Sequence, residues 1–168
     1  MNKVFALIIL SLLVLGCGNR SQDSASTENI SRKSKKFVKT GMNLLQKGNV
    51  SKAIWNLDEA IRQDPRNSAN YVILGQVYLK LKNFEKAQDS FQAATRVDPA
   101  DGKAFYLLAV SKHLRGRLSE AAVDAQKSAE IFIKKRDKER FQKSVNLLNH
   151  IKETTEKIKV TEDNSQNI

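Results

Sequence analysis

The stretch SANYVILGQVYLKLKNFEKAQDSFQAATRVDPAD, residues 68–101, decides the fold of this chain. Each half of it carries apolar residues at helical spacing, with small residues among them. The dipeptide Lys82-Asn83 separates the halves. The dipeptide Asp98-Pro99 ends the second half, because proline disfavours helical geometry in the residue before it. The stretch predicts two helices, near residues 68–81 and 84–97, folded against each other as a hairpin.

The same pattern occurs three times at a fixed spacing. A shift of 34 residues aligns Gly41 with Gly75, Ala60 with Ala94, and Asp64-Pro65 with Asp98-Pro99. A second shift of the same length reaches Phe105, Ala109, Ala121 and Ser128. A constant period of this size is typical of a helical solenoid. We therefore expect repeats at 34–67, 68–101 and 102–135, with further helices near residues 34–47, 50–63, 103–115 and 118–136.

These residues resemble the tetratricopeptide repeat. The middle repeat carries the family pattern as Tyr71, Leu74, Gly75, Tyr78, Ala87, Phe91, Ala94 and Pro99. The first repeat departs from it at Thr40, Leu44 and Leu57, and the third at Lys112 and Ile133. The resemblance implies an all-α solenoid of three helical hairpins. Small residues at Gly41, Gly75 and Ala109 would let the two helices of each hairpin pack closely.

The chain continues beyond the third repeat with a further apolar stripe. Residues 137–159 place Phe141, Val145, Leu148, Ile151 and Ile158 on one helical face. The last repeat of a solenoid would otherwise expose its apolar side, so we expect a capping helix here. The alternative is a coiled coil that binds a partner. Residues 160–168 are polar and predict a disordered tail.

Composition excludes several classes of protein. The chain has 168 residues, with 29 Lys and Arg against 18 Asp and Glu, a net charge of +11. Its single cysteine rules out an internal disulfide, and two histidines leave little for a metal cage. His113 and His150 stand far apart in the sequence, and Gly-rich phosphate loops are missing. We therefore expect neither an enzyme nor a bound metal or cofactor.

The first residues of the chain predict where in the cell the protein is located. Residues 1–16 combine a basic start with an apolar run too short to span a bilayer, as in a secretory signal peptide. Val14-Leu15-Gly16-Cys17 resembles the lipobox of bacterial lipoproteins, which implies a lipid on Cys17. An uncleaved anchor with an incidental cysteine is the alternative. Residues 17–33 are polar and predict a flexible tether. In lipoprotein sorting, Gly18 after the cysteine implies the outer membrane, with the protein facing the periplasm.

A binding groove follows from the family resemblance. Tetratricopeptide arrays hold a peptide or helix on the concave face formed by the first helix of each hairpin. By register this face carries Val38, Met42, Leu45, Val72, Gln76, Leu79, Tyr106, Val110 and His113. Each of them could instead pack against a neighbouring hairpin. Some relatives clamp a terminal carboxylate with Lys and Asn at fixed groove positions. In the first repeat those positions hold Val38, Met42 and Lys39, so that clamp is not expected. Trp55 is interpreted as structural, packed between hairpins.

The function predicted from these features is partner binding at the bacterial cell envelope. A lipid-anchored scaffold or assembly factor for a protein or peptide partner fits best, with a generic resemblance to pilus- and secretin-assembly lipoproteins. Alternatives are an adaptor for cell-wall enzymes and an accessory enzyme subunit with an unrecognised site. Basic residues gather at 31–36 and 134–143. An envelope protein rarely meets nucleic acid, so we expect these clusters to face anionic lipid or an acidic partner, or simply solvent.

Overall fold

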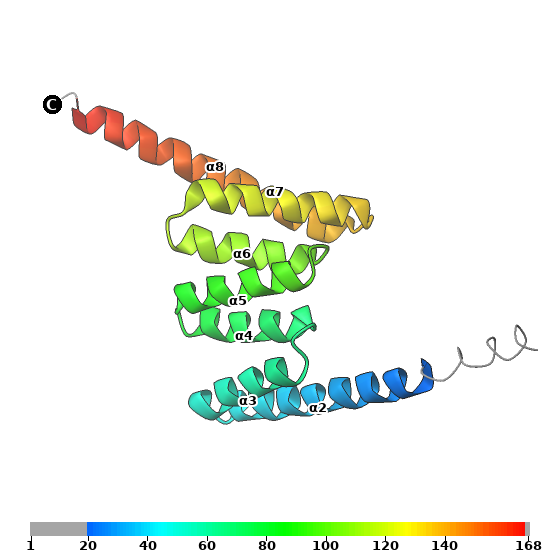
Figure 1. Ribbon diagram of the computed structural model, residues 1–168. Helices are drawn as coiled ribbons and strands as arrows, with labels where there is room; N and C mark the ends of the chain where they lie inside the picture. Colours follow the sequence, from blue (N-terminus) through cyan, green and yellow to red (C-terminus); the bar gives the residue numbers. More distant parts are fainter. Residues whose placement is uncertain (1–19, 167–168) are drawn as a thin grey trace, which may run out of the picture.

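The computed structural model describes residues 20–166, which form seven α-helices and no strand. In chain order the helices are α2 (Arg20–Gln46), α3 (Val50–Gln63), α4 (Ser68–Lys80), α5 (Phe84–Val97), α6 (Gly102–Leu114), α7 (Leu118–Lys134) and α8 (Lys138–Gln166). They stack in this order from one end of the molecule to the other (Figure 1). None of these helices is long and apolar enough to cross a bilayer.

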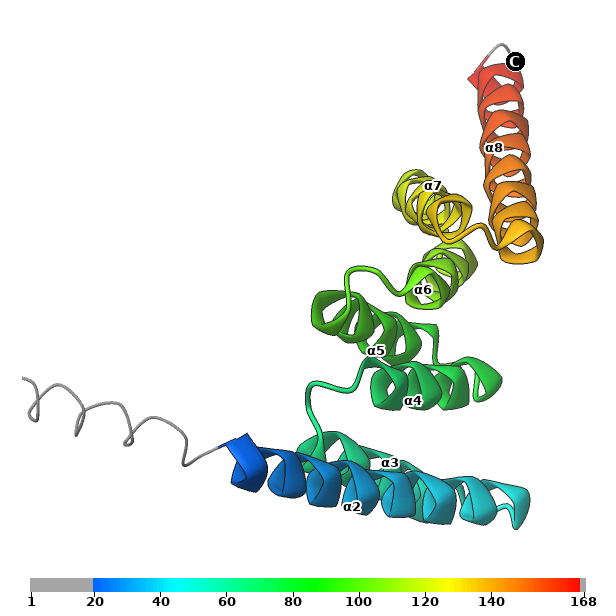
Figure 2. The same ribbon diagram turned by 90° about the vertical axis from the view of Figure 1, so that its right-hand side faces the viewer.

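The helices pair into three hairpins, α2–α3, α4–α5 and α6–α7, and α8 packs against α7 and α6. Figure 2 shows α4, α6 and α8 along one side of the stack, with α5 and α7 along the other. The predicted all-α solenoid of three hairpins followed by a further helix is therefore confirmed. The repeat helices begin and end within two residues of their predicted limits, except at the N-terminus of α2.

Small and aromatic residues make the core, as the repeat pattern requires. In the middle repeat Ala87, Phe91 and Ala94 are fully buried, and Ala104 and Leu108 of the next hairpin complete the same cluster. A methyl group on Gly75 would lie 2.5 Å from the ring of Phe91. That glycine therefore accommodates the aromatic ring of the facing helix α5.

Two departures from the repeat pattern have visible consequences. Lys112 replaces the expected tyrosine, and its Nζ lies 2.6 Å from Oδ2 of Asp124, a residue of the facing helix α7. Burial raises the pKa of the Asp124 carboxyl, and Lys112 opposes that rise. Ile133 replaces the closing proline. Without a proline α7 runs for 17 residues, where α3 and α5 have 14 each.

Two of the predicted disordered segments are helical in the structure. The predicted tether at 17–33 is wrong from residue 20 onward, because α2 begins at Arg20. The predicted tail at 160–168 is wrong up to residue 166, because α8 continues to Gln166. Neither extension contains glycine or proline, so nothing stops a helix that the packed part has already nucleated. Residues 1–16, Cys17 and Gly18 lie outside the described part of the chain.

Trp55 does not pack between hairpins. Its side chain is 57% exposed on α3 and meets the ring of Phe37 on α2 edge to face, with 6.4 Å between the ring centres. Both residues belong to the first hairpin. The interpretation of Trp55 as an inter-hairpin core residue is therefore wrong.

Candidate functional site

The predicted groove residues divide into core residues and accessible ones. Val72 is only 4% exposed and belongs to the core around Phe91, so it does not line an open surface. Val38 and Leu45 pack against a core that the first and middle hairpins share, and Leu79 packs against the core around Phe91. These four residues pack on cores that adjacent hairpins share, which fits the alternative of packing against a neighbouring hairpin. The residues that keep accessible surface without such a role are Met42, Gln76, Tyr106, Val110 and His113.

A pocket opens at the end of this face, between α6 and α8. Its volume is about 220 Å³, and its walls are mostly apolar. The six lining residues come from three helices: Lys103, Tyr106, Leu107, Phe132, Arg140 and Lys143. Only Tyr106 was among the residues predicted to bind a partner. The other five were missed. Arg140 and Lys143 lie on α8, which does not follow the repeat register, and Lys103, Leu107 and Phe132 line a pocket only because α8 packs beside them.

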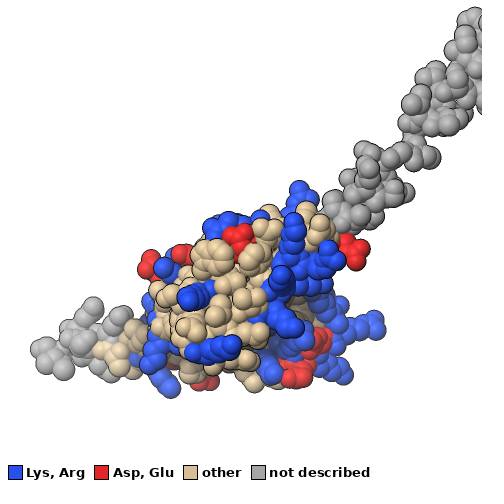
Figure 3. Space-filling model, turned by 90° about the horizontal axis from the view of Figure 1, so that it is seen from below, with Lys and Arg blue, Asp and Glu red and all other residues tan. Residues whose placement is uncertain are grey.

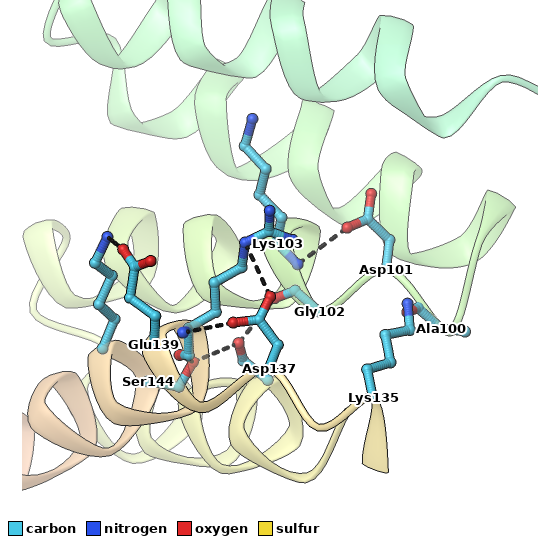
Figure 4. A network of polar contacts seen from close by, with 11 residues as sticks. Ala100, Asp101, Gly102, Lys103, Lys135, Asp137, Glu139 and Ser144 are labelled. Carbon is cyan, nitrogen blue, oxygen red and sulfur yellow. Dashed lines mark hydrogen bonds and ion pairs between the residues drawn. The ribbon is translucent and has the colours of Figure 1, made fainter. Parts of the chain in front are cut away.

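Three cations rim this pocket. Arg140 lies over the ring of Phe132, with 5.7 Å from its guanidinium carbon to the ring centre. It also pairs with Asp137 at 3.4 Å, and Lys143 pairs with Glu139 at 2.7 Å. Glu139 raises the pKa of Lys143, which keeps that ammonium charged. The Lys103 ammonium has no acidic partner within the described chain, and in Figure 4 it extends away from the labelled acids. The pocket therefore combines an apolar interior with a positive rim.

A polar network holds the three walls in place (Figure 4). The Asp101 carboxylate accepts hydrogen bonds from the first backbone N–H groups of α6, those of Lys103 and Ala104. Ser128 of α7 donates to the carbonyl oxygen of Gly102 at 2.8 Å, and its hydroxyl lies 2.8 Å from that of Ser144 on α8. Both hydroxyls are fully buried, where an unmade hydrogen bond is costly. The start of α6 and the start of α8 are thus joined through α7.

A histidine pair forms a second link between α6 and α8. The rings of His113 and His150 meet edge to face, with 5.3 Å between their centres. Burial lowers the pKa of His113, and the nearby His150 lowers it further. Two imidazoles do not make a metal site, and no group of three potential ligands occurs between residues 27 and 161. The sequence separation of 37 residues concealed this contact, again because it depends on α8.

Comparison with known proteins agrees with the fold. Residues 73–136 match a family model described as tetratricopeptide repeat, and residues 56–89 match a second model with the same description. Tetratricopeptide repeat protein 37 of Xenopus laevis is 30% identical over 90 residues, which are 54% of this chain and 6% of that protein. The photosystem I assembly protein Ycf3 of Acaryochloris marina is 26% identical over 110 residues, 63% of this chain and 66% of that protein.

Solved structures show the same arrangement of helices. The TPR2B domain of yeast Sti1, solved as a pHsp70 complex, is similar with a TM-score of 0.67 at 15% identity, over 73% of this chain and 98% of that one. The type III secretion translocator chaperone SycD of Yersinia enterocolitica gives 0.65 at 20% identity, over 73% of this chain and 85% of that one. The repeated residues, the solenoid fold and these matches show that the chain contains tetratricopeptide repeats, which the two family models match over residues 56–136.

Proposed function

We propose that this protein binds an acidic segment of a partner protein along the face of α4 and α6, with one side chain seated in the pocket between α6 and α8. The pocket carries this proposal. Its volume of about 220 Å³ is below the roughly 300–1,000 Å³ of small-molecule sites, and it fits a peptide side chain. An apolar interior with a positive rim favours an apolar residue flanked by Asp or Glu.

Similar structures support a peptide as the occupant. One is the first repeat domain of Spaghetti bound to the HSP90 peptide SRMEEVD, a sequence with three acidic residues. Another is SycD in complex with a peptide of the translocator YopD. Both are under 25% identical to this chain, so they supply the kind of ligand and not its identity. The partner of this protein is proposed to be a protein of the cell envelope.

The binding proposal is tested by selecting peptides from a random display library on the immobilised full chain. We expect peptides enriched in Asp and Glu next to an apolar residue, and weaker capture at higher salt, because salt screens exposed charges. Lys103→Glu should reduce capture at least tenfold. The matched control Lys52→Glu makes the same charge change on an exposed residue of α3 and should leave capture unchanged. Selected peptides without acidic bias, or equal loss in both variants, would refute the proposal.

We further propose that Cys17 carries a lipid that holds the protein at the bacterial envelope, with Gly18 favouring the outer membrane. This rests on the lipobox resemblance of Val14-Leu15-Gly16-Cys17. Two or three acyl chains give a stable anchor, where a single chain is marginal. Cys17→Ser should abolish incorporation of a radioactive fatty acid and leave the protein unprocessed. Equal label in this variant and in the wild type would contradict the anchor.

A further inference from the structure

The outer side of α2 carries exposed polar residues at the positions that are buried in the equivalent helix of the next repeat. In α4 the residues that face the preceding hairpin are Asn70, Leu74 and Val77, which are 3–6% exposed. Leu74 and Val77 pack on Leu57, and Asn70 donates a hydrogen bond to Ser34. A shift back by one repeat places Lys36, Thr40 and Asn43 at these positions of α2, and all three are exposed. The side of α2 that would face a preceding repeat is therefore an unpartnered surface of this structure.

This surface is strongly basic. Between residues 27 and 63 there are eight Lys and Arg residues and three Asp and Glu residues. Of the acids, Asp58 is half-buried and Glu59 is paired with Arg62. The four cations at 32–36 have no acidic partner in the described chain. Figure 3, which views the molecule from the α2–α3 end, shows Lys and Arg side chains around an uncharged centre.

Exposed apolar side chains accompany the charge. Ile30 is 44% exposed and Trp55 is 57% exposed. Phe37 contacts Trp55. Phe37 also follows Ile30 by seven residues, so Ile30 and Phe37 lie on the same side of α2. Tryptophan and basic residues on one face are typical of protein surfaces that lie in the headgroup region of a bilayer. The combination fits a lipid surface better than water alone.

We propose that the outer face of the first hairpin docks on an anionic bilayer, with Trp55, Phe37 and Ile30 in the headgroup region and Lys33 and Lys36 on lipid phosphates. The inference deepens the proposed anchor, because residue 17 precedes this hairpin and would keep it near the membrane. Each basic side chain near such a surface favours the docked form by roughly fivefold. Docked in this way, the array holds α8 and the pocket at its far end from the membrane.

Trp55 is the only tryptophan of the chain and reports docking directly. The full chain is reconstituted in vesicles of phosphatidylcholine, alone or mixed equally with phosphatidylglycerol, with bromine on the acyl chains as quencher. We expect Trp55 emission to shift to the blue and to be quenched in the mixed vesicles, and much less in phosphatidylcholine alone. Lys33→Gln with Lys36→Gln should lower the ratio of docked to undocked protein by roughly 25-fold.

The matched control is Lys152→Gln with Lys159→Gln, an equal charge change on exposed residues of α8. It should leave the quenching of Trp55 unchanged. The proposal is overturned if Trp55 stays unquenched in anionic vesicles that carry the protein on flotation, or if the control removes quenching as fully as the α2 variant. Flotation and fatty-acid labelling report the anchor separately. A protein that floats with the vesicles but whose Trp55 is not quenched would refute docking and leave the lipid anchor standing. Loss of flotation in Cys17→Ser bears on the anchor and does not refute docking.

Discussion

At the scale of single residues, the contact between Gly75 and Phe91 sets how closely the middle hairpin packs. Phe91 has no exposed surface, so its ring cannot turn into solvent to admit a methyl group at Gly75. We expect Gly75→Ala to destabilise the protein by about 1–3 kcal/mol through overpacking, despite the better helix propensity of alanine. Urea unfolding measures this. Gly41→Ala should cost less, because its nearest neighbour would be at 3.1 Å and not 2.5 Å. The reverse order would contradict the packing described for these hairpins.

The imidazole of His113 provides a second prediction at this scale. Its pKa is lowered in the folded protein, mainly by burial, from an ordinary value of 6.5. The unfolded chain therefore binds a proton at a higher pH than the folded chain. Its contribution to stability is complete well above pH 6.5 and is lost as the pH falls from there toward the lowered pKa. As the pH falls through this interval, the urea midpoint of unfolding of the wild type should decrease, and that of His113→Gln should change less. Parallel pH profiles for the two proteins would exclude this role.

At the scale of helices and turns, three connections share one backbone geometry. The residues at 48, 82 and 116 are one repeat apart and have φ of 75°, 56° and 73°. Two are glycine, and the middle one is Lys82, for which a left-handed conformation costs about 1–2 kcal/mol. We expect Lys82→Gly to stabilise the protein by about 0.5–1 kcal/mol, because glycine removes this strain at some cost in unfolded-state entropy. The urea midpoint should rise. Lys39→Gly, inside α2 and exposed, should lower it, because glycine weakens a helix interior. A decrease in both variants would count against the turn geometry.

At the scale of the whole molecule, the sequence was informative wherever the repeat holds. Gly41, Gly75 and the two Asp-Pro dipeptides recur in register, and a residue's position in the repeat then predicts its helix and its burial. The pocket and the histidine pair depend on α8, which has no counterpart in an earlier repeat. Val72 was misplaced for a different reason: register gives the direction of a side chain, and the tilt between hairpins decides how much of it stays exposed. The helical extension from Arg20 was missed because polar residues were read as disordered, although no helix breaker stood among them.

The order of contacts along the stack has a consequence for how the chain reaches its structure. Helix contacts are made chiefly between neighbours in the sequence, and the pairing of α6 with α8 is the main exception. Between residues 20 and 166 each helix packs mainly on its neighbours in the sequence, so little loop entropy opposes the first steps of folding, as in other proteins of low contact order. Each hairpin can therefore form as soon as its second helix has been made. The last helix, α8, closes the exposed side of the third hairpin when it arrives.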